Sequence, residues 1–219
     1  MNFSSQIRCV IFDMDGVIID SERLHKKAYY ETFDYIGVKV SERLYDNLTG
    51  SSTINAFEKL KTHFNLEINP KKLVLEKRRR YVEYFNNDPS LKLVDGVEEL
   101  IIKLHEKGIK LILASSSAMV NINRVFNRFN LDRFFSFKIS GADLKTSKPH
   151  PEIFEKAVLL SKFSNKKCLV IEDSDNGIKA AKAANIDVVG FNNPLSRGQT
   201  LNDADYVINS FSELGFNTF

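Results

Sequence analysis

A short apolar run near the start of the chain, followed by two aspartates, constrains the fold most. The stretch 9–17 opens with strand-forming apolar residues and continues with Asp13, Asp15 and Gly16. An apolar run without alternation is typical of a strand buried on both faces of a parallel sheet. Because successive strand residues face opposite sides, Asp13 and Asp15 should point the same way. We therefore expect both carboxylates at the carboxyl end of a central strand, where open α/β sheets bind ligands.

At this spacing Asp13 and Asp15 would repel each other. Such a pair is stable only where a cation, a proton or nearby hydrogen-bond donors compensate the charge. A hard divalent ion such as Mg2+ prefers oxygen ligands of this kind. Taken alone, the stretch also fits an ordinary strand that ends in a polar turn, so the rest of the chain has to decide.

The second part of the chain alternates short apolar runs with helical patterns. The expected strands span 110–114, 137–140, 168–171, 187–190 and 206–208, and the expected helices span 97–107, 118–129, 151–161 and 178–184. Alternation of this kind predicts an α/β fold built on a doubly wound parallel sheet, a Rossmann-like core.

A block of helical pattern separates the first strand from the second. Its four expected helices span 21–35, 41–48, 53–64 and 70–85, and a polar linker at 86–90 ends the block. The block contains no convincing strand pattern. Because it interrupts the alternation, we expect an inserted α-helical cap domain over residues 20–88. The catalytic core would then comprise residues 1–19 and 89–219.

Polar clusters lie at or near the ends of the expected strands. They are Asp13 with Asp15, the serines 115–117, Lys148 before a helix, and Glu172 with Asp173. The carboxyl ends of parallel strands meet at one edge of a sheet, so the four clusters should converge. Carboxylates from two strands can hold Mg2+, whereas a serine hydroxyl, N–H groups at a helix start and a lysine can hold phosphate. Together they predict a phosphoryl-transfer site.

Each cluster also has a simpler interpretation. The serines 115–117 would cap the next helix, Lys148 would be a surface lysine, and the acids 172 and 173 would favour the following helix through its dipole. All four clusters, however, lie near the ends of expected strands. A single functional site that they share therefore explains them better than four unrelated structural roles.

Composition narrows the class of protein. The 219 residues carry 31 Lys and Arg against 28 Asp and Glu, too small an excess to indicate nucleic-acid binding. No apolar segment is long enough to span a bilayer, and residues 1–8 have no signal-peptide pattern. Cys9 and Cys168 lie in apolar runs and are expected to be buried free thiols. We therefore expect a cytoplasmic protein with no membrane or nucleic-acid partner, and a monomer rather than an oligomer.

The four clusters carry a resemblance to a known family. The sequence resembles the haloacid dehalogenase-like hydrolases, and within them the β-phosphoglucomutase-like branch of phosphatases. The similarity runs through the whole expected core and is weaker in the expected cap. The matching stretches are 12–17 with 20–22, 113–117, 147–154 and 171–174.

This resemblance implies chemical roles for the acidic residues. Asp13 would be the nucleophile that takes the phosphoryl group, and Asp15 would be the general acid and base. The cofactor would be Mg2+, held by Asp13, the backbone carbonyl of Asp15, Glu172 and Asp173. The presence of Asp15 argues against the dehalogenase and phosphonatase branches, whose patterns lack an acid there.

The resemblance assigns phosphate binding to Ser115, Ser116 and Lys148. The ammonium group of Lys148 would also screen Asp13 from its acidic neighbours. The part of the substrate beyond its phosphate would then be bound by the cap.

In the expected cap, the candidate substrate contacts are His25, Thr53 and Lys77. His25 matches a cap histidine of the mutase pattern. That pattern also has a lysine and an arginine that hold a second phosphate, whereas this chain has Thr49 and Thr53 at those positions. Lys77 or an arginine of the run 78–80 would have to replace them.

The function that the resemblance implies is a Mg2+-dependent phosphatase. It would hydrolyse a small phosphomonoester, a sugar phosphate or a similar metabolite, through an aspartyl-phosphate intermediate. One alternative is a phosphosugar mutase of the β-phosphoglucomutase type. An alternative of another class is a non-catalytic protein that binds phosphorylated metabolites, although a chain of that class has no need of Asp13, Asp15 and Asp173.

Overall fold

A six-stranded parallel sheet forms the centre of the molecule. The computed structural model describes residues 7–48, 51–194 and 198–215. The sheet order is β3-β2-β1-β4-β5-β6, and every neighbouring pair is parallel. The strands are β1 (Cys9–Phe12), β2 (Lys110–Ser115), β3 (Phe135–Ser140), β4 (Cys168–Glu172), β5 (Asp187–Phe191) and β6 (Tyr206–Ile208). The predicted α/β fold class is confirmed.

Helices cover both faces of this sheet. On one face, α5 (Val97–Glu106) and α6 (Met119–Phe129) share an apolar cluster with Val10 and Phe12 of β1. On the other face, α7 (Glu152–Ser161) and α8 (Asp175–Ala183) share a cluster with Cys9 and Ile11. Alternate residues of β1 therefore enter opposite layers, as a central strand buried on both sides requires. Three 3-10 turns complete the core: Gly141–Asp143, Asn165–Lys167 and Phe211–Glu213.

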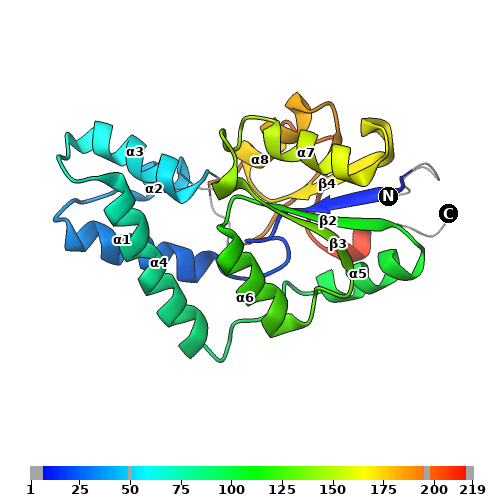
Figure 1. The fold of residues 1–219 in the computed structure, drawn as a ribbon, viewed down its shortest axis with the longest axis horizontal. Helices are drawn as coiled ribbons and strands as arrows, with labels where there is room; N and C mark the ends of the chain where they lie inside the picture. Colours follow the sequence, from blue (N-terminus) through cyan, green and yellow to red (C-terminus); the bar gives the residue numbers. More distant parts are fainter. Residues whose placement is uncertain (1–6, 49–50, 195–197, 216–219) are drawn as a thin grey trace.

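Four helices are inserted between β1 and α5. They are α1 (Glu22–Tyr35), α2 (Glu42–Asp46), α3 (Thr53–Phe64) and α4 (Pro70–Asn87). They lie beside the carboxyl end of the sheet, the end toward which the strand arrows point (Figure 1). Side chains of all four helices form a separate apolar cluster around Phe33 and Phe57.

The boundary between the inserted helices and the core is not sharp. Leu24 and Ala28 of α1, and Tyr81 and Phe85 of α4, belong to the apolar cluster of the core. Those ends of α1 and α4 are therefore anchored on the core, while their far ends pack with α2 and α3 in the separate cluster. The domain boundaries at 20 and 88 stay a prediction.

Local sequence explains where several helices begin and end. Asn69 accepts a hydrogen bond from the backbone N–H of Lys71, and Pro70 stands in the first turn of α4. Ser174 caps α8 in the same way by accepting from the N–H of Gly177. Asn130 ends α6 in the left-handed conformation that asparagine tolerates.

Several boundaries differ from those expected from sequence. Helix α4 extends into the predicted linker as far as Asn87, because only Asp88, which precedes Pro89, is forced into an extended conformation. Strand β3 begins at Phe135 rather than at 137, and its pairing with β2 contains an irregularity. Helix α8 begins at Asp175 because its cap is Ser174.

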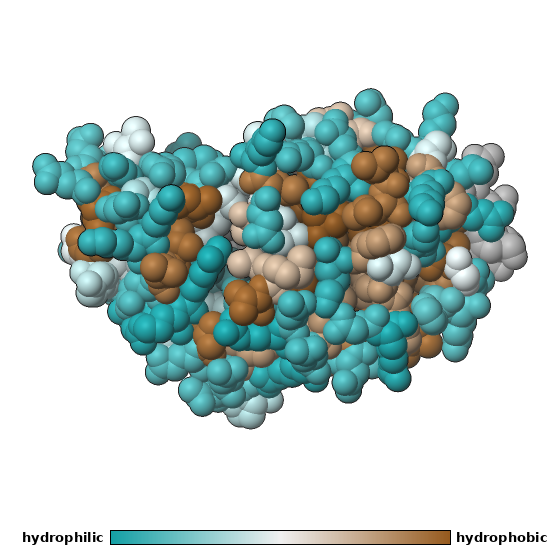
Figure 2. Space-filling view, viewed as in Figure 1, coloured by the Kyte–Doolittle hydropathy of each residue, from teal (hydrophilic) through white to brown (hydrophobic). Residues whose placement is uncertain are grey.

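The face of the molecule in Figure 2 is mostly hydrophilic, and its apolar side chains gather mainly to the right of centre, over the core. None of the described helices is both long enough and apolar enough to cross a membrane. Cys9 and Cys168 are buried free thiols, as predicted.

Candidate active site

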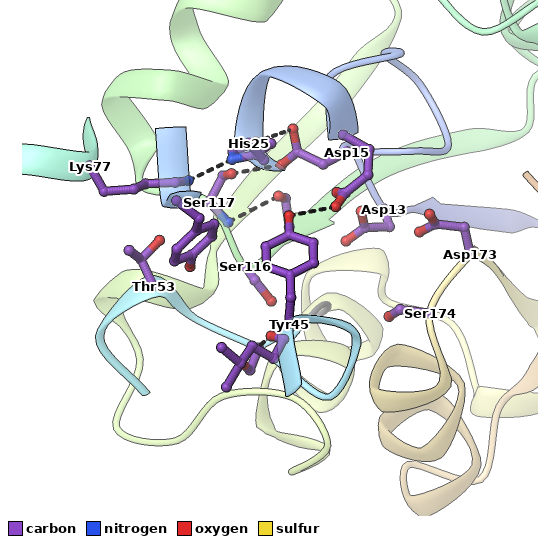
Figure 3. Close-up of a pocket in the computed structure, with 15 residues that line it drawn as sticks. Asp13, Asp15, His25, Tyr45, Thr53, Lys77, Ser116, Ser117, Asp173 and Ser174 are labelled. Atoms are coloured by element: carbon purple, nitrogen blue, oxygen red, sulfur yellow. Dashed lines mark hydrogen bonds and ion pairs between the residues drawn. The ribbon is translucent and has the colours of Figure 1, made fainter. Parts of the chain in front are cut away.

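One pocket collects most of the residues that the sequence singled out. It lies at the carboxyl ends of β1, β2 and β4, beneath the inserted helices, and encloses about 650 Å³ of empty space that is partly open to solvent. Figure 3 shows its lining. The predicted site residues in this lining are Asp13, Asp15, His25, Thr53, Lys77, Ser115, Ser116 and Asp173. Lys148 and Glu172, the two remaining predicted residues, are buried against this lining.

Lys148 is a buried cation between two acids. Its Nζ atom donates to Asp13 Oδ1 at 2.5 Å, to Glu172 Oε1 at 2.6 Å and to the carbonyl of Ala114 at 3.0 Å. Burial alone would lower the pKa of Lys148, but Asp13 and Glu172 outweigh it and hold this pKa above its usual range. Lys148 is 2% exposed, so the surface-lysine interpretation is wrong.

Glu172 is engaged through both carboxylate oxygens. Oε1 accepts from Lys148, and Oε2 accepts from the backbone N–H groups of Asp173 and Ser174 and from the Ser174 hydroxyl, at 2.9 to 3.0 Å. A Cβ atom at Gly177 would lie 1.8 Å from Glu172 Oε1. Glu172 therefore orients Lys148 and the loop that carries Asp173. Its carboxylate fits only because residue 177 is a glycine.

Asp13 has one carboxylate oxygen fixed and one available. Oδ1 accepts from Lys148, whereas Oδ2 has no hydrogen-bond partner among the described residues. The backbone N–H of Asp13 donates to the carbonyl of Ile171 at 3.0 Å, which extends the β1–β4 pairing by one residue. Burial, helped by Glu172 and Asp15 and opposed by Lys148, raises the pKa of Asp13 to about 7. The free oxygen is thus a fixed nucleophile candidate that borders the pocket.

Asp15 accepts three hydrogen bonds from side chains. Ser21 Oγ donates to Oδ1 at 2.5 Å, His25 Nε2 donates to Oδ1 at 2.9 Å, and Ser117 Oγ donates to Oδ2 at 2.7 Å. Burial alone would raise the pKa of Asp15, but His25 and these hydrogen bonds hold it well below its usual range. The turn after Asp15 brings Ser21 and His25 within reach, and Gly16 enters that turn with a φ of 88° that other residues rarely adopt.

His25 connects Asp15 to Lys77. Nε2 bonds to Asp15, and Nδ1 lies 2.6 Å from Lys77 Nζ. Because an ammonium group can only donate, Nδ1 must accept, and the ring is neutral with its proton on Nε2. Burial and Lys77 lower the pKa of His25, in agreement with a neutral ring. The chain Lys77–His25–Asp15 links α4 and α1 of the insertion to the core, and Figure 3 draws its bonds as dashed lines.

The serine loop after β2 faces the pocket instead of capping α6. The N-cap of α6 is Ala118, which makes no side-chain cap hydrogen bond. Ser115 Oγ accepts from the backbone N–H of Ser117 at 3.1 Å, and Ser117 Oγ donates to Asp15. The helix-cap interpretation of these serines is therefore wrong. Their hydroxyls and N–H groups border the space next to Asp13, where an anion could bind.

The site carries more buried negative charge than its own residues neutralise. Figure 3 shows the carboxylates of Asp13 and Asp173 facing each other, and both residues are under 10% exposed. Lys148 is the cation bonded to Asp13 and Glu172, and His25 beside Asp15 is neutral. Such an excess suits a divalent cation. In the described residues, however, no three acidic, histidine or cysteine side chains converge as a ready-made metal cage.

Sequence reasoning missed part of the pocket lining. Tyr29, Tyr45 and Glu22 all border the pocket, yet none of them was predicted to lie there, and the bond from Ser117 to Asp15 was not expected. Glu22 belongs to a stretch that matches the family pattern, which was the one available signal. The two tyrosines carried no signal, because an aromatic residue at helical spacing is usually part of a core.

Comparison with known proteins identifies the family. Residues 10–191 match the family model described as haloacid dehalogenase-like hydrolase. The chain is a haloacid dehalogenase-like hydrolase. This confirms the family that the sequence resembles.

Relatives of this hydrolase include phosphatases and a mutase. It is 31% identical to a phosphorylated carbohydrates phosphatase of Thermotoga maritima, over 92% of this chain and 93% of the relative. It is 29% identical to the β-phosphoglucomutase of Bacillus subtilis, over 95% of this chain and 92% of the relative. A CbbY variant of Rhodobacter sphaeroides has been solved in complex with xylulose-(1,5)bisphosphate. It superposes on this chain with a TM-score of 0.84 at 25% sequence identity, and the match covers 95% of this chain and 96% of that one. The chain is therefore an enzyme of the phosphatase and phosphosugar mutase group.

Proposed function

We propose that this haloacid dehalogenase-like hydrolase is a Mg2+-dependent phosphatase that acts on a small phosphomonoester through an aspartyl-phosphate. The substrate would be a sugar phosphate or a similar metabolite. The observation that carries this proposal is the asymmetry of Asp13, one oxygen held by Lys148 and the other without a partner among the described residues. That arrangement aims one oxygen at an incoming phosphorus atom and suits in-line attack.

In the first step, Asp13 Oδ2 would form a bond to phosphorus while the bond from phosphorus to the leaving oxygen breaks. Asp15 would give its proton to that leaving oxygen. The free enzyme keeps Asp15 ionised through its three hydrogen bonds. A bound phosphate adds negative charge beside Asp15 and raises its pKa, so the proton would be present when it is needed.

In the second step, water would attack the aspartyl-phosphate and restore Asp13. Asp15, now ionised, would take a proton from that water and return to its acid form. Lys148, the Ser115 hydroxyl and the N–H of Ser116 would stabilise the charge on the phosphoryl oxygens. Both steps use the same groups, which is why one acid–base residue is enough.

The residues present fit a magnesium ion. Asp13 and Asp173, with the backbone carbonyl of Asp15, would hold it, and water and phosphate oxygens would complete a set of oxygen ligands, as Mg2+ prefers. When bound, Mg2+ would offset the charge of the phosphoryl group. Glu172 is not included, because its hydrogen bonds to Lys148 and to the 173–174 backbone occupy both of its oxygens.

Hydrolysis is favoured over mutase chemistry by the cations near the pocket. A mutase has to bind a bisphosphate in both orientations, which calls for cations at both ends. Arg79 and Arg80 form ion pairs with Glu76, Glu83 and Glu31. Among the described residues that line the pocket, Lys77 is the cation that the inserted helices contribute, whereas Thr53 contributes a hydroxyl group. Thr49 lies outside the described residues.

A mutase remains the second candidate because the β-phosphoglucomutase of B. subtilis is nearly as similar as the phosphatase relative. Phosphate release and isomerisation should therefore be measured together, with β-glucose 1-phosphate and a panel of sugar phosphates, with Mg2+ or with EDTA. We expect phosphate release that requires Mg2+ and exceeds isomerisation, even when glucose 1,6-bisphosphate is added. Isomerisation faster than phosphate release would favour the mutase. Binding without any turnover would favour a non-catalytic protein.

A further inference from the structure

A second pocket lies at the amino ends of β2 and β3, at the end of the sheet that faces away from the inserted helices (Figure 1). Its lining comes from residues 105–110, at the end of α5, and from residues 133–136, which lead into β3. It encloses about 580 Å³ of empty space that is partly open to solvent, a usual size for a small-molecule site. Among the described residues, its lining and that of the active site have none in common.

The floor of this second pocket is apolar and is held by the core. Ile109 is buried, and Phe134 and Phe135 are half-buried. The ring of Phe135 packs against that of Phe126, with centroids 5.1 Å apart. The ring of Phe134 meets that of His105 edge to face at 5.4 Å. The floor is therefore a fixed apolar surface that a flat ligand group could cover.

Arg133 stands at the rim of this floor with its donors unused. Its guanidinium group lies over the ring of Phe134, 4.6 Å from the centroid. The neighbouring acid, Asp132, is bonded to Lys138 at 2.6 Å instead. Among the described residues, the side chains of Arg133 and His105 have no hydrogen-bond or ion-pair partner. A guanidinium group can bond to a carboxylate through two parallel hydrogen bonds, so Arg133 is able to bind an anion.

The end of α5 does not oppose an anion strongly, because its carbonyl groups are engaged. The carbonyls of His105 and Leu104 accept from the N–H groups of Gly108 and Ile109, at 2.9 and 3.0 Å. Lys110 turns its Nζ atom away from the pocket to a backbone carbonyl of α7, at 2.9 Å. The positive charge available to a ligand is thus that of one guanidinium group, which matches a single negative charge.

These features select a class of ligand. A neutral flat molecule would cover the floor but would leave the guanidinium group without a partner. A bare inorganic anion would bond to the guanidinium group but would leave the apolar floor in water. A cation would be repelled. A molecule with one carboxylate on a flat apolar body satisfies the floor and the rim together.

We propose that this second pocket is a binding site for a small aromatic carboxylate. The carboxylate bonds to Arg133, and the ring packs on Phe134 and Phe135. His105 and Ser136 supply further donors at the rim. The inference goes beyond the proposed phosphatase function and does not depend on it, because the active site contributes no described residue to this pocket.

Indole acids test this site with a direct optical signal. The sequence contains no tryptophan, so the fluorescence anisotropy of a bound indole can be measured without background from protein indole. Indole-3-carboxylate, indole-3-acetate and indole-3-propionate differ in the reach of the carboxylate and are titrated with EDTA present. At least one of them should bind to the wild type. Its neutral amide should bind about tenfold or more weakly, the scale of a hydrogen bond to a charged group.

Variants locate the bound acid. Arg133→Ala should weaken its binding about tenfold or more. Arg43→Ala, which removes an exposed arginine of α2, should leave the affinity unchanged. Lys77→Ala, in the lining of the active site, should also leave it unchanged. Circular dichroism checks that each variant is folded.

Acetate tests the apolar floor, because it carries the same charge without the ring. It should displace the indole acid only at about tenfold higher concentration or more, the scale of burying an apolar side chain. The inference is overturned if none of the three acids binds, or if the amide or acetate binds as tightly as the acid. It is also overturned if Arg133→Ala binds like the wild type, or if Lys77→Ala removes the binding. None of these results bears on phosphate release, so the phosphatase is judged separately.

Discussion

At the scale of single residues, the site is defined by which carboxylate oxygens are engaged. Glu172 uses both of its oxygens, Asp15 uses both, Asp13 uses one, and Glu22 uses one. The free oxygens of Asp13 and Glu22 can meet a substrate directly, whereas Glu172 holds other groups in place. Asp15 would have to give up one of its hydrogen bonds when it transfers a proton.

Asp13→Asn should abolish phosphate release while the fold stays intact. A neutral amide is a poor nucleophile and a poor ligand for Mg2+, and loss of a covalent nucleophile costs about 10³-fold or more. Steady-state phosphate release measures the effect, and circular dichroism checks the fold. A variant that keeps more than a tenth of wild-type activity would refute the aspartyl-phosphate mechanism.

Glu22→Gln should stabilise the free enzyme at high pH. A glutamate side chain ordinarily has a pKa of 4.5, and burial in the fold raises the pKa of Glu22 to about 7. A raised pKa in an acid contributes stability that is complete below 4.5 and is lost as the pH rises to about 7. Glutamine resembles the protonated acid at every pH. Its advantage should therefore grow between about pH 4.5 and about pH 7, level off above that, and reach about 1–3 kcal/mol, on the scale of about 1.4 kcal/mol for each pH unit.

Urea denaturation in EDTA at pH 5, 6, 7 and 8 measures that difference, with Glu83→Gln as the exposed control. EDTA keeps metal binding from altering the comparison. A difference between Glu22→Gln and wild type that is constant with pH would show that Glu22 is not held in an unfavourable charged state.

At the scale of secondary-structure elements, α8 supports the site through the closeness of its first turn to β4. Glu172 ends β4, Ser174 caps α8, and Gly177 in the first turn leaves no room for a Cβ atom beside the carboxylate. The element thus fixes the acid that orients Lys148. It does so through the close approach of its backbone at Gly177 and through the hydroxyl of its cap, Ser174, which donates to Glu172.

Gly177→Ala should destabilise the protein and lower its activity. In an exposed helix this change would stabilise by up to about 1 kcal/mol. Here the added Cβ atom would overlap Glu172, so we expect a cost of about 2 kcal/mol or more, as in overpacked cores. Denaturation and phosphate release measure both effects.

Gly108→Ala serves as the control for that substitution. Gly108 has a φ of 70° and open space around it, away from the pocket. Alanine there should cost about 1–2 kcal/mol of stability, and phosphate release should stay at the wild-type rate. If Gly177→Ala has no larger effect on activity than Gly108→Ala, the support of Glu172 by α8 is not needed for catalysis.

At the scale of the whole molecule, two paired linkers join the core to the inserted helices. The N–H of Asp20 donates to the carbonyl of Lys92, and the N–H of Val94 donates to the carbonyl of Ile18. The far end of the insertion contacts the core separately, where Asn55 Nδ2 donates to Ser147 Oγ at 2.7 Å. A cap that closes needs a hinge and a second contact that can form and break. The paired linkers can provide the hinge, and the Asn55–Ser147 hydrogen bond can provide the second contact.

We expect the cap to open in the free enzyme and to close on a phosphate analogue. Closure would exclude water and bring the Lys77–His25 pair onto Asp15. Small-angle scattering with and without Mg2+ and orthovanadate should give a smaller radius of gyration for the complex. Asn55→Ala, which removes the far contact, should shift the free enzyme toward the open form. Identical scattering curves with and without the analogue would contradict a moving cap.

The sequence alone determined the layout of the core and the identity of its polar strand ends. Apolar runs that alternate with helical patterns leave few folds other than a parallel sheet, and residues that follow its strands meet at one edge by geometry. Asp13, Asp15, Ser115 and Asp173 could therefore be predicted from local pattern. Information of this kind is contained in each strand and the few residues after it.

Only the tertiary structure decided how those groups share hydrogen bonds. Three features depend on distances between segments that are far apart in the chain. They are the bond from Lys148 to Glu172, the link from Lys77 to Asp15 through His25, and the fixed orientation of Glu22. Spacing in sequence does not determine these distances, because packing of the inserted helices on the core sets them. The core chemistry is thus local in sequence, whereas the recognition of the leaving group is a property of the packed molecule.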